Sequence, residues 1–163
     1  VVIGDHGFGT RRQLTDLDLL RFKVPVLLIA PGITERFGAR NDTVGTQVDV
    51  VPTIMGRLGG EVQHQCWGRD LLSLPSGERG FGVIKPSGGG QTVGLLRGDE
   101  LVVQPRGEAP RAYHYQLGWD AAVTQLAEVP ADLREQLKAY VQTATSALLD
   151  DKVGAEIAAG KGR

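Results

Sequence analysis

The chain has 163 residues, enough for one ordinary domain or for part of a larger one. Hydrophobic residues make up 41% and charged residues 23%, a globular composition that argues against a disordered chain. The 18 basic and 19 acidic residues give a net charge of −1, so we expect neither a nucleic-acid partner nor a strong patch for anionic membranes.

The chain opens with the end of an apolar strand that runs into a glycine-punctuated loop. Val1, Val2 and Ile3 precede the tetrapeptide Gly-Asp-His-Gly at residues 4–7. Chemistry is often placed at the carboxyl end of a strand in an α/β sheet. A carboxylate and a neutral imidazole that converge there suit Mn²⁺ or Zn²⁺ better than Mg²⁺ or Ca²⁺. By itself, a loop Asp-His pair is more often a capping or surface arrangement, so the tetrapeptide alone does not establish a metal site.

The next segments alternate between polar loops and one strongly apolar run. Residues 10–23 predict a loop or a short surface helix. Residues 24–30 form a continuous apolar run that the turn signal Pro31-Gly32 closes. Such a run is typical of a central strand buried on both faces. Residues 33–45, rich in Gly, Arg, Asn and Asp, predict an exposed loop.

A helix is predicted from residue 46 to about residue 58. Asp49 can cap its free backbone N–H groups, and Pro52 falls in the first turn, where its missing donor costs nothing. The glycines at 59 and 60 end the helix. Its apolar residues repeat at helical spacing and predict one apolar face: Val51, Ile54, Met55 and Leu58.

After residue 72 the pattern changes to short strands separated by turn residues. Residues 81–84, 92–97, 100–104 and 112–117 predict an antiparallel meander, with a compact hairpin at Arg97-Gly98-Asp99. Pro130 then introduces a long helix from residue 131 to about residue 150, whose apolar stripe should pack on one face of the meander. The tail at residues 154–163 is expected to fray.

Several single residues have a structural and a functional interpretation. Cys66, the one cysteine, rules out an internal disulfide and is expected to be a small buried residue. His64 lies near it in a polar loop, where a Cys/His metal pair is the less favoured alternative. His114 is expected to be a half-exposed sheet residue, and Trp67 and Trp119 are expected to be packing anchors.

The order of motifs resembles the C-terminal half of the sulfatase family within the alkaline phosphatase superfamily. There, a strand ending in Gly-Asp-His-Gly is followed by an apolar strand ending in Pro-Gly, by a helix of the form qvDi.PTil..lG, and by a G.dLl segment. In this chain the corresponding residues are 4–7, 26–32, 47–59 and 68–72. Within the family the match is best to the lipoteichoic-acid-synthase type, which are membrane-anchored phosphoglycerol transferases. The resemblance covers residues 1–72 well and the remainder only in general shape.

The resemblance implies roles for four residues. Asp5 and His6 become metal ligands, with Mn²⁺ the expected ion and Zn²⁺, Mg²⁺ or Ca²⁺ as alternatives. Thr10 matches a hydroxyl position near the phosphoglycerol head group. Arg12, beside Arg11, could pair with a phosphate or sulfate oxygen, although solvated loop charges are the alternative.

The resemblance also implies that the chain is one part of a larger enzyme. The Thr nucleophile and a further acidic ligand of these relatives lie far upstream and are not in this chain, so we expect it to be inactive by itself. Arylsulfatases commonly carry Asn where this chain has His6, which favours phosphoryl-ester over sulfate-ester chemistry. A sulfate-ester or phosphodiester hydrolase, or a non-catalytic binding domain, remains the alternative.

The expected fold is therefore α/β, the C-terminal part of an alkaline-phosphatase-like sandwich with a small antiparallel sheet packed on a long C-terminal helix. We expect residues 1–75 to belong to the catalytic core, 76–153 to form the meander-plus-helix subdomain, and 154–163 to be a tail. The expected substrate is a phosphate or sulfate ester, such as a phospholipid head group. We expect the parent protein to be anchored at the extracytoplasmic face of the membrane, in the cell envelope. We expect no targeting signal within these 163 residues, and we expect them to self-associate through exposed core strands.

Overall fold

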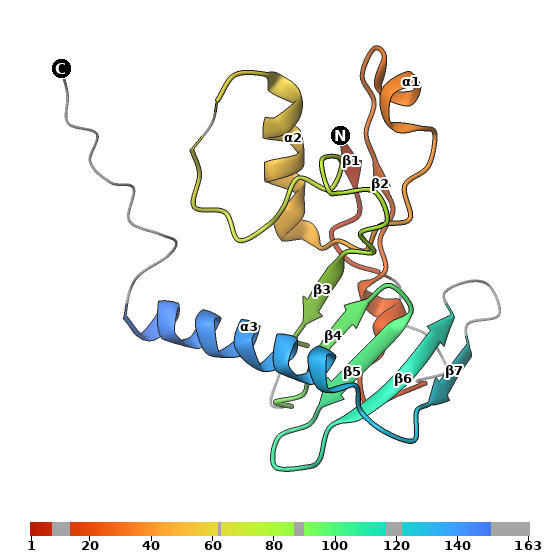
Figure 1. Ribbon diagram of the computed structural model, residues 1–163, viewed down its shortest axis with the longest axis vertical. Coiled ribbons are helices and arrows are strands. Elements are labelled where there is room, and N and C mark those ends of the chain that lie inside the picture. The colour runs from red at the N-terminus through yellow and green to blue at the C-terminus, as the bar shows by residue number, and fades with distance from the viewer. Residues whose placement is uncertain (8–13, 62, 87–89, 117–121, 151–163) are drawn as a thin grey trace.

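The computed structural model describes residues 1–7, 14–61, 63–86, 90–116 and 122–150. It consists of a two-stranded sheet with short helices, followed by a five-stranded sheet and one long helix (Figure 1). Both sheets are antiparallel, and the expected α/β fold class is confirmed. Of the helices in these ranges, none combines the length and the apolar composition that crossing a bilayer requires.

The larger sheet is a meander in which every strand pairs with its neighbour in the sequence. Gly98, with a φ of 60°, begins the tight connection between the second and third of these strands, where Arg97 pairs with Glu100. The four predicted strands are confirmed within a residue or two, and a fifth, mostly exposed edge strand follows them. The strands are β3 (Phe81–Ile84), β4 (Val93–Arg97), β5 (Glu100–Gln104), β6 (Arg111–Gln116) and β7 (Ala122–Gln125).

The two faces of this sheet have separate hydrophobic cores, because side chains alternate along each strand. On one face, Leu95 and Val102 pack against Leu133 and Leu137 of the long helix α3 (Ala131–Leu149). On the other face, the buried core includes Leu17 and Leu19 from the segment that follows the Asp-His loop, together with Leu96, Leu101, Val103, Tyr113 and Tyr115. The N-terminal part of the chain therefore contributes directly to the core of the meander.

The predicted long helix is present, but the sheet covers only its first half. It contacts β4 and β5, and Figure 1 shows its far end extending beyond the sheet. Leu133 is fully buried, whereas Leu148, in the same predicted stripe, is 79% exposed. Among the described residues, the sheet therefore covers the first part of the apolar stripe and leaves its C-terminal part exposed.

The apolar run at residues 24–30 differs from its prediction. Only Val26–Leu27 forms a strand, β2, and it pairs with β1 (Val2–Ile3) alone. Val26, Leu27 and Ile29 are all exposed, so the run is not a central strand buried on both faces. The reason is that burial requires further strands and covering helices, and within the described residues β1 is the one strand that pairs with it.

The segment after β2 contains short helices in place of one loop and one continuous helix. A short helix α1 (Ile33–Phe37) lies in the predicted loop. A single 3₁₀ turn, η2 (Gln47–Asp49), precedes α2 (Val50–Leu58), which ends at Gly59 as predicted. The apolar face of α2 is only partly covered, because Val51 and Leu58 are exposed.

The expectation for Cys66 is wrong. Its side chain is exposed, and its backbone N–H donates to Nδ1 of His64. The adjacent Trp67 takes the inward position, where its ring meets Tyr140 of α3 edge to face with 5.6 Å between centroids. Trp67 is therefore a packing residue as predicted, and Trp119 lies outside the described residues.

Candidate metal-binding loop and its supports

The Asp-His loop leaves the end of β1 and is held by backbone hydrogen bonds on both sides. The N–H of Gly4 donates to the carbonyl of Pro25 at 3.3 Å, and the N–H of Gly7 donates to the carbonyl of Arg21 at 2.8 Å. A Cβ at residue 7 would lie 2.5 Å from the same Arg21 oxygen, so only glycine allows this close approach. The loop is thus fixed at both of its ends.

Asp5 and His6 project from this loop into solvent and face each other. Their side chains are 91% and 80% exposed, and Nε2 of His6 lies 3.7 Å from Oδ2 of Asp5. Nδ1 of His6 lies 3.0 Å from the carbonyl oxygen of Gly7. A carbonyl only accepts, so Nδ1 carries the proton in the neutral ring, and the lone pair of Nε2 is left on the side of Asp5.

This arrangement fits a divalent metal ion. Metal-binding histidines generally donate their other ring N–H to a backbone carbonyl or carboxylate, as His6 does here. Two donors that each lie about 2.1 Å from an ion can be at most about 4.2 Å apart, so a 3.7 Å separation suits one shared ion. Among the described residues, no group of three or more His, Cys, Asp or Glu side chains could hold a metal. A metal site that included Asp5 and His6 would therefore need further ligands from outside the described residues.

The other residues singled out by the sequence do not join this pair in the described structure. Thr10 and Arg12 lie outside the described residues, and their roles stay predictions. His64 and Cys66 are near each other but have no third ligand in that part of the chain. His114 is half exposed, as expected, and its Nδ1 lies 3.8 Å from Oδ2 of Asp99 in the larger sheet.

Gln47 is a neighbour of the loop that sequence reasoning missed. Its side-chain amide donates to the carbonyl of Gly4 at 3.1 Å and to the carbonyl of Asp5 at 2.9 Å. These contacts join residues more than 40 positions apart, so no local pattern indicates them. The only available signal is that Gln47 opens the helix motif directly after Thr46.

Asp49 has a different role from the helix cap predicted for it. Its side chain makes no cap hydrogen bond to α2 but accepts from the N–H of Thr46 at 2.7 Å, which completes a capping box around η2. It is 1% exposed and also accepts from the backbone N–H of Arg69 at 2.7 Å. Asp49 therefore joins the start of the helix to the 68–72 segment.

Arg69 extends this connection to the larger sheet. Its guanidinium contacts both carboxylate oxygens of Asp49 at 3.2 Å and donates to the carbonyl of Phe81, at the start of β3, at 2.6 Å. The same group lies 4.0 Å from the centre of the Phe81 ring. Together, these contacts tie η2, the 68–72 segment and the meander into one polar cluster.

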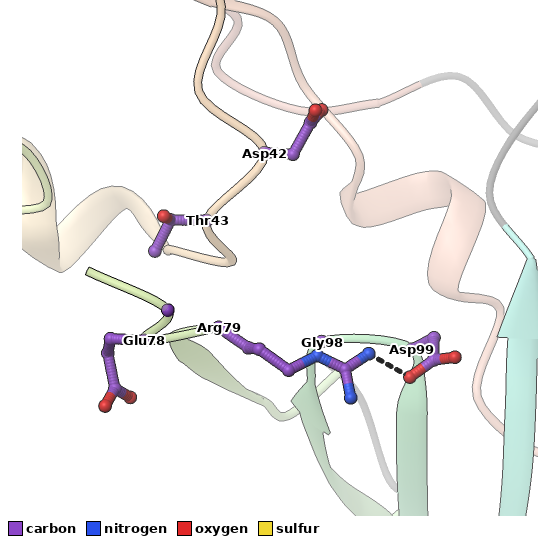
Figure 2. A pocket seen from close by; sticks show the side chains of 7 residues that line it. Asp42, Thr43, Glu78, Arg79, Gly98 and Asp99 are labelled. Atoms are coloured by element: carbon purple, nitrogen blue, oxygen red, sulfur yellow. Dashed lines mark hydrogen bonds and ion pairs between the residues drawn. The ribbon is translucent and has the colours of Figure 1, made fainter. Parts of the chain in front are cut away.

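An open cleft elsewhere in the molecule is unsuited to an anionic ester. It is lined by Asp42, Thr43, Gly77, Glu78, Arg79, Gly98 and Asp99. Figure 2 shows the Arg79 side chain extending to Asp99, and this hydrogen bond lowers the pKa of the Asp99 carboxyl below its ordinary value. The cation is therefore paired, and the other charged groups of the lining are carboxylates that would repel phosphate or sulfate.

The fold is found in a known structure. No family model matches the chain. A crystal structure of a protein in the alkaline phosphatase superfamily from Vibrio parahaemolyticus is similar over 94% of this chain, with a TM-score of 0.75 and 22% sequence identity. This chain has the fold of one part of an alkaline phosphatase superfamily protein. It spans 36% of the length of that structure.

The likeness confirms the superfamily-level fold expected from the sequence. At 94% of the chain, it extends well beyond the first 72 residues, where the motif resemblance is strongest. At 22% sequence identity, the likeness concerns the fold alone.

Proposed function

We propose that this chain supplies the Asp5-His6 corner of a metal site in a phosphoryl- or sulfuryl-ester enzyme of the phosphoglycerol-transferase or sulfatase type. The observation that carries the proposal is the orientation of His6. Its Nε2 faces Asp5, and its other ring nitrogen is occupied by the Gly7 carbonyl. The similarity in fold to an alkaline phosphatase superfamily protein supports the proposed class of enzyme.

The residues of this chain would hold and orient one side of the site. Asp5 supplies a negative oxygen and His6 a neutral nitrogen, a donor set that suits Mn²⁺ and Zn²⁺. A divalent ion bound there would lower the pKa of a hydroxyl nucleophile and neutralise charge that develops on the transferred group. Thr10 and Arg12 are proposed to contact the ester, and the Thr nucleophile is proposed to come from outside this chain.

Within the superfamily we favour the phosphoglycerol-transferase branch. The support is His6, at a position where arylsulfatases commonly carry Asn, together with the motif order described above. The proposed parent protein is membrane-anchored and acts on a phospholipid head group at the outer face of the membrane.

Mn²⁺ is expected to broaden the NMR signals of residues 5–7 selectively when it is added to this chain. Two ligands alone bind weakly, but the paramagnetic effect needs only transient occupancy. Asp5→Asn and His6→Ala are each expected to abolish the selective broadening, because each removes one of the two donors. The measurement is a titration followed by two-dimensional ¹H–¹⁵N spectra.

The chain contains a matched control for this titration. His114 and Asp99 are also an exposed His-Asp pair, with 3.8 Å between nitrogen and oxygen, but Asp99 is bonded to Arg79. Broadening around His114 should be much weaker than around His6. Equal broadening at the two pairs, or none at residues 5–7, would overturn the proposed metal site.

The substrate class requires an assay on a longer polypeptide that contains this chain and the missing ligands. With Mn²⁺ present, we expect activity on phosphatidylglycerol and on a nitrophenyl phosphate diester, and slower release from nitrophenyl sulfate. This chain alone should give no turnover on any of the three. Faster release from nitrophenyl sulfate would favour a sulfatase over a phosphoglycerol transferase. Turnover by this chain alone would contradict the proposal that the nucleophile comes from outside it.

A further inference from the structure

Gln47 makes side-chain hydrogen bonds that reach the Asp-His loop from a distant part of the sequence. Its amide group donates to two successive carbonyls, those of Gly4 and Asp5, at 3.1 and 2.9 Å. A primary amide has two N–H donors, so one group can satisfy both acceptors at once. It reaches them from η2, the turn that precedes α2.

The two bonded carbonyls belong to the two peptide planes that flank the Cα of Asp5. Each peptide unit is planar, so its orientation is set once its carbonyl direction is set. Holding both planes therefore fixes the backbone dihedrals of Asp5, which determine where its side chain points and where His6 begins. The N–H groups of Gly4 and Gly7 are held by the carbonyls of Pro25 and Arg21. The carbonyl of the peptide between Asp5 and His6 is held by Gln47, and the N–H of that peptide donates to Oδ1 of Asp5 at 2.9 Å.

We infer that Gln47 is a positioning residue that holds the Asp5-His6 loop in its metal-binding conformation. This inference rests on the proposed metal site and adds a residue to it. Gln47 touches neither the ion nor the substrate and acts through the backbone of Asp5. Without its two hydrogen bonds, the loop would retain its ends and the local bonds of Asp5 and His6, but it would lose the contacts that fix the two peptide planes on either side of Asp5.

The test uses Gln47→Met, which keeps the length of the side chain and removes both donors. Without metal, amide hydrogen exchange at His6 and Gly7 is expected to become faster by about fivefold for each lost hydrogen bond. With Mn²⁺, the concentration needed for half-maximal broadening of residues 5–7 is expected to rise about tenfold or more, as for other supporting residues of metal sites.

Gln104→Met is the matched control, because the Gln104 amide also donates to two backbone carbonyls, those of Pro105 and Glu108, at 2.8 and 2.7 Å. It lies in the larger sheet, so its replacement should leave exchange and Mn²⁺ broadening at residues 5–7 unchanged. Unchanged signals from the meander in Gln47→Met would show that the variant is folded.

The outcomes separate the inference from the proposed function. If the wild-type chain shows no selective Mn²⁺ broadening, the metal site fails, whatever Gln47 does to exchange. If the wild-type chain responds and Gln47→Met has the same exchange rates and the same Mn²⁺ dependence, the positioning role is overturned while the metal site stands. Faster exchange at His6 and Gly7 in Gln47→Met, together with a weaker Mn²⁺ response, supports both.

Discussion

Replacing Asp49 by alanine is expected to lower the free energy of unfolding by about 3 kcal/mol. The carboxylate is 1% exposed and accepts hydrogen bonds from Thr46 and Arg69. Removing one partner of a buried ion pair costs about 3–5 kcal/mol, because the remaining charge and N–H groups are left without compensation. The Arg69 side chain keeps 24% exposure, so water relieves part of that cost and the lower end of the range is expected.

Urea unfolding followed by circular dichroism measures this change. Asp42→Ala is the control, because Asp42 also pairs with an arginine, Arg40, but its side chain is 75% exposed. Exposed pairs contribute at most about 1 kcal/mol, so this variant should be nearly as stable as the wild type. A loss of less than about 1 kcal/mol in Asp49→Ala would contradict the role of Asp49 as a structural link.

Leu133→Ala in α3 is expected to destabilise the fold by about 3–5 kcal/mol. Leu133 is fully buried and packs with Leu95 and Val102 of the sheet and with Leu137 of its own helix. The substitution removes apolar contacts and leaves a cavity between two rigid elements, a helix and a central part of the sheet, that cannot readily collapse.

The same helix provides the control for this substitution. Leu148→Ala makes the same chemical change at a residue that is 79% exposed, and alanine has the higher helix propensity, so no measurable loss is expected. Thermal or urea unfolding of the two variants gives the comparison. Similar losses in both would mean that the distal half of α3 is covered to the same extent as the first half.

The elements that the sequence predicts well are those whose evidence is local. The short apolar runs of β4 and β5, bounded by turn residues, and the helical spacing of Leu133 and Leu137 are patterns that a short window contains. The structure also provides a cover for both faces of the sheet: the long helix α3 packs on one face, and the segment with Leu17 and Leu19 packs on the other. The edge strand β7 escaped prediction because it has only four residues, of which Thr124 and Gln125 are polar and three are exposed.

The features that the sequence does not predict depend on distant neighbours. The run at residues 24–30 has the composition of a buried strand, but its burial depends on strands that the described residues do not include. The pairing of Gln47 with the loop and of Arg69 with Asp49 spans 42 and 20 positions, respectively. The residue types and the motif order indicated Asp5 and His6 as candidate site residues. The hydrogen bonds from Gln47 that support their loop are seen only in the three-dimensional structure.

The turn Gln47–Asp49 has a consequence for how this protein could evolve. Within three residues, one side chain reaches back to the Asp-His loop and another reaches Arg69, which in turn contacts the first strand of the meander. A mutation that shifts the turn to suit one neighbour also displaces the other. Amino-acid changes in the Asp-His loop and around Arg69 should therefore covary among homologues instead of occurring independently.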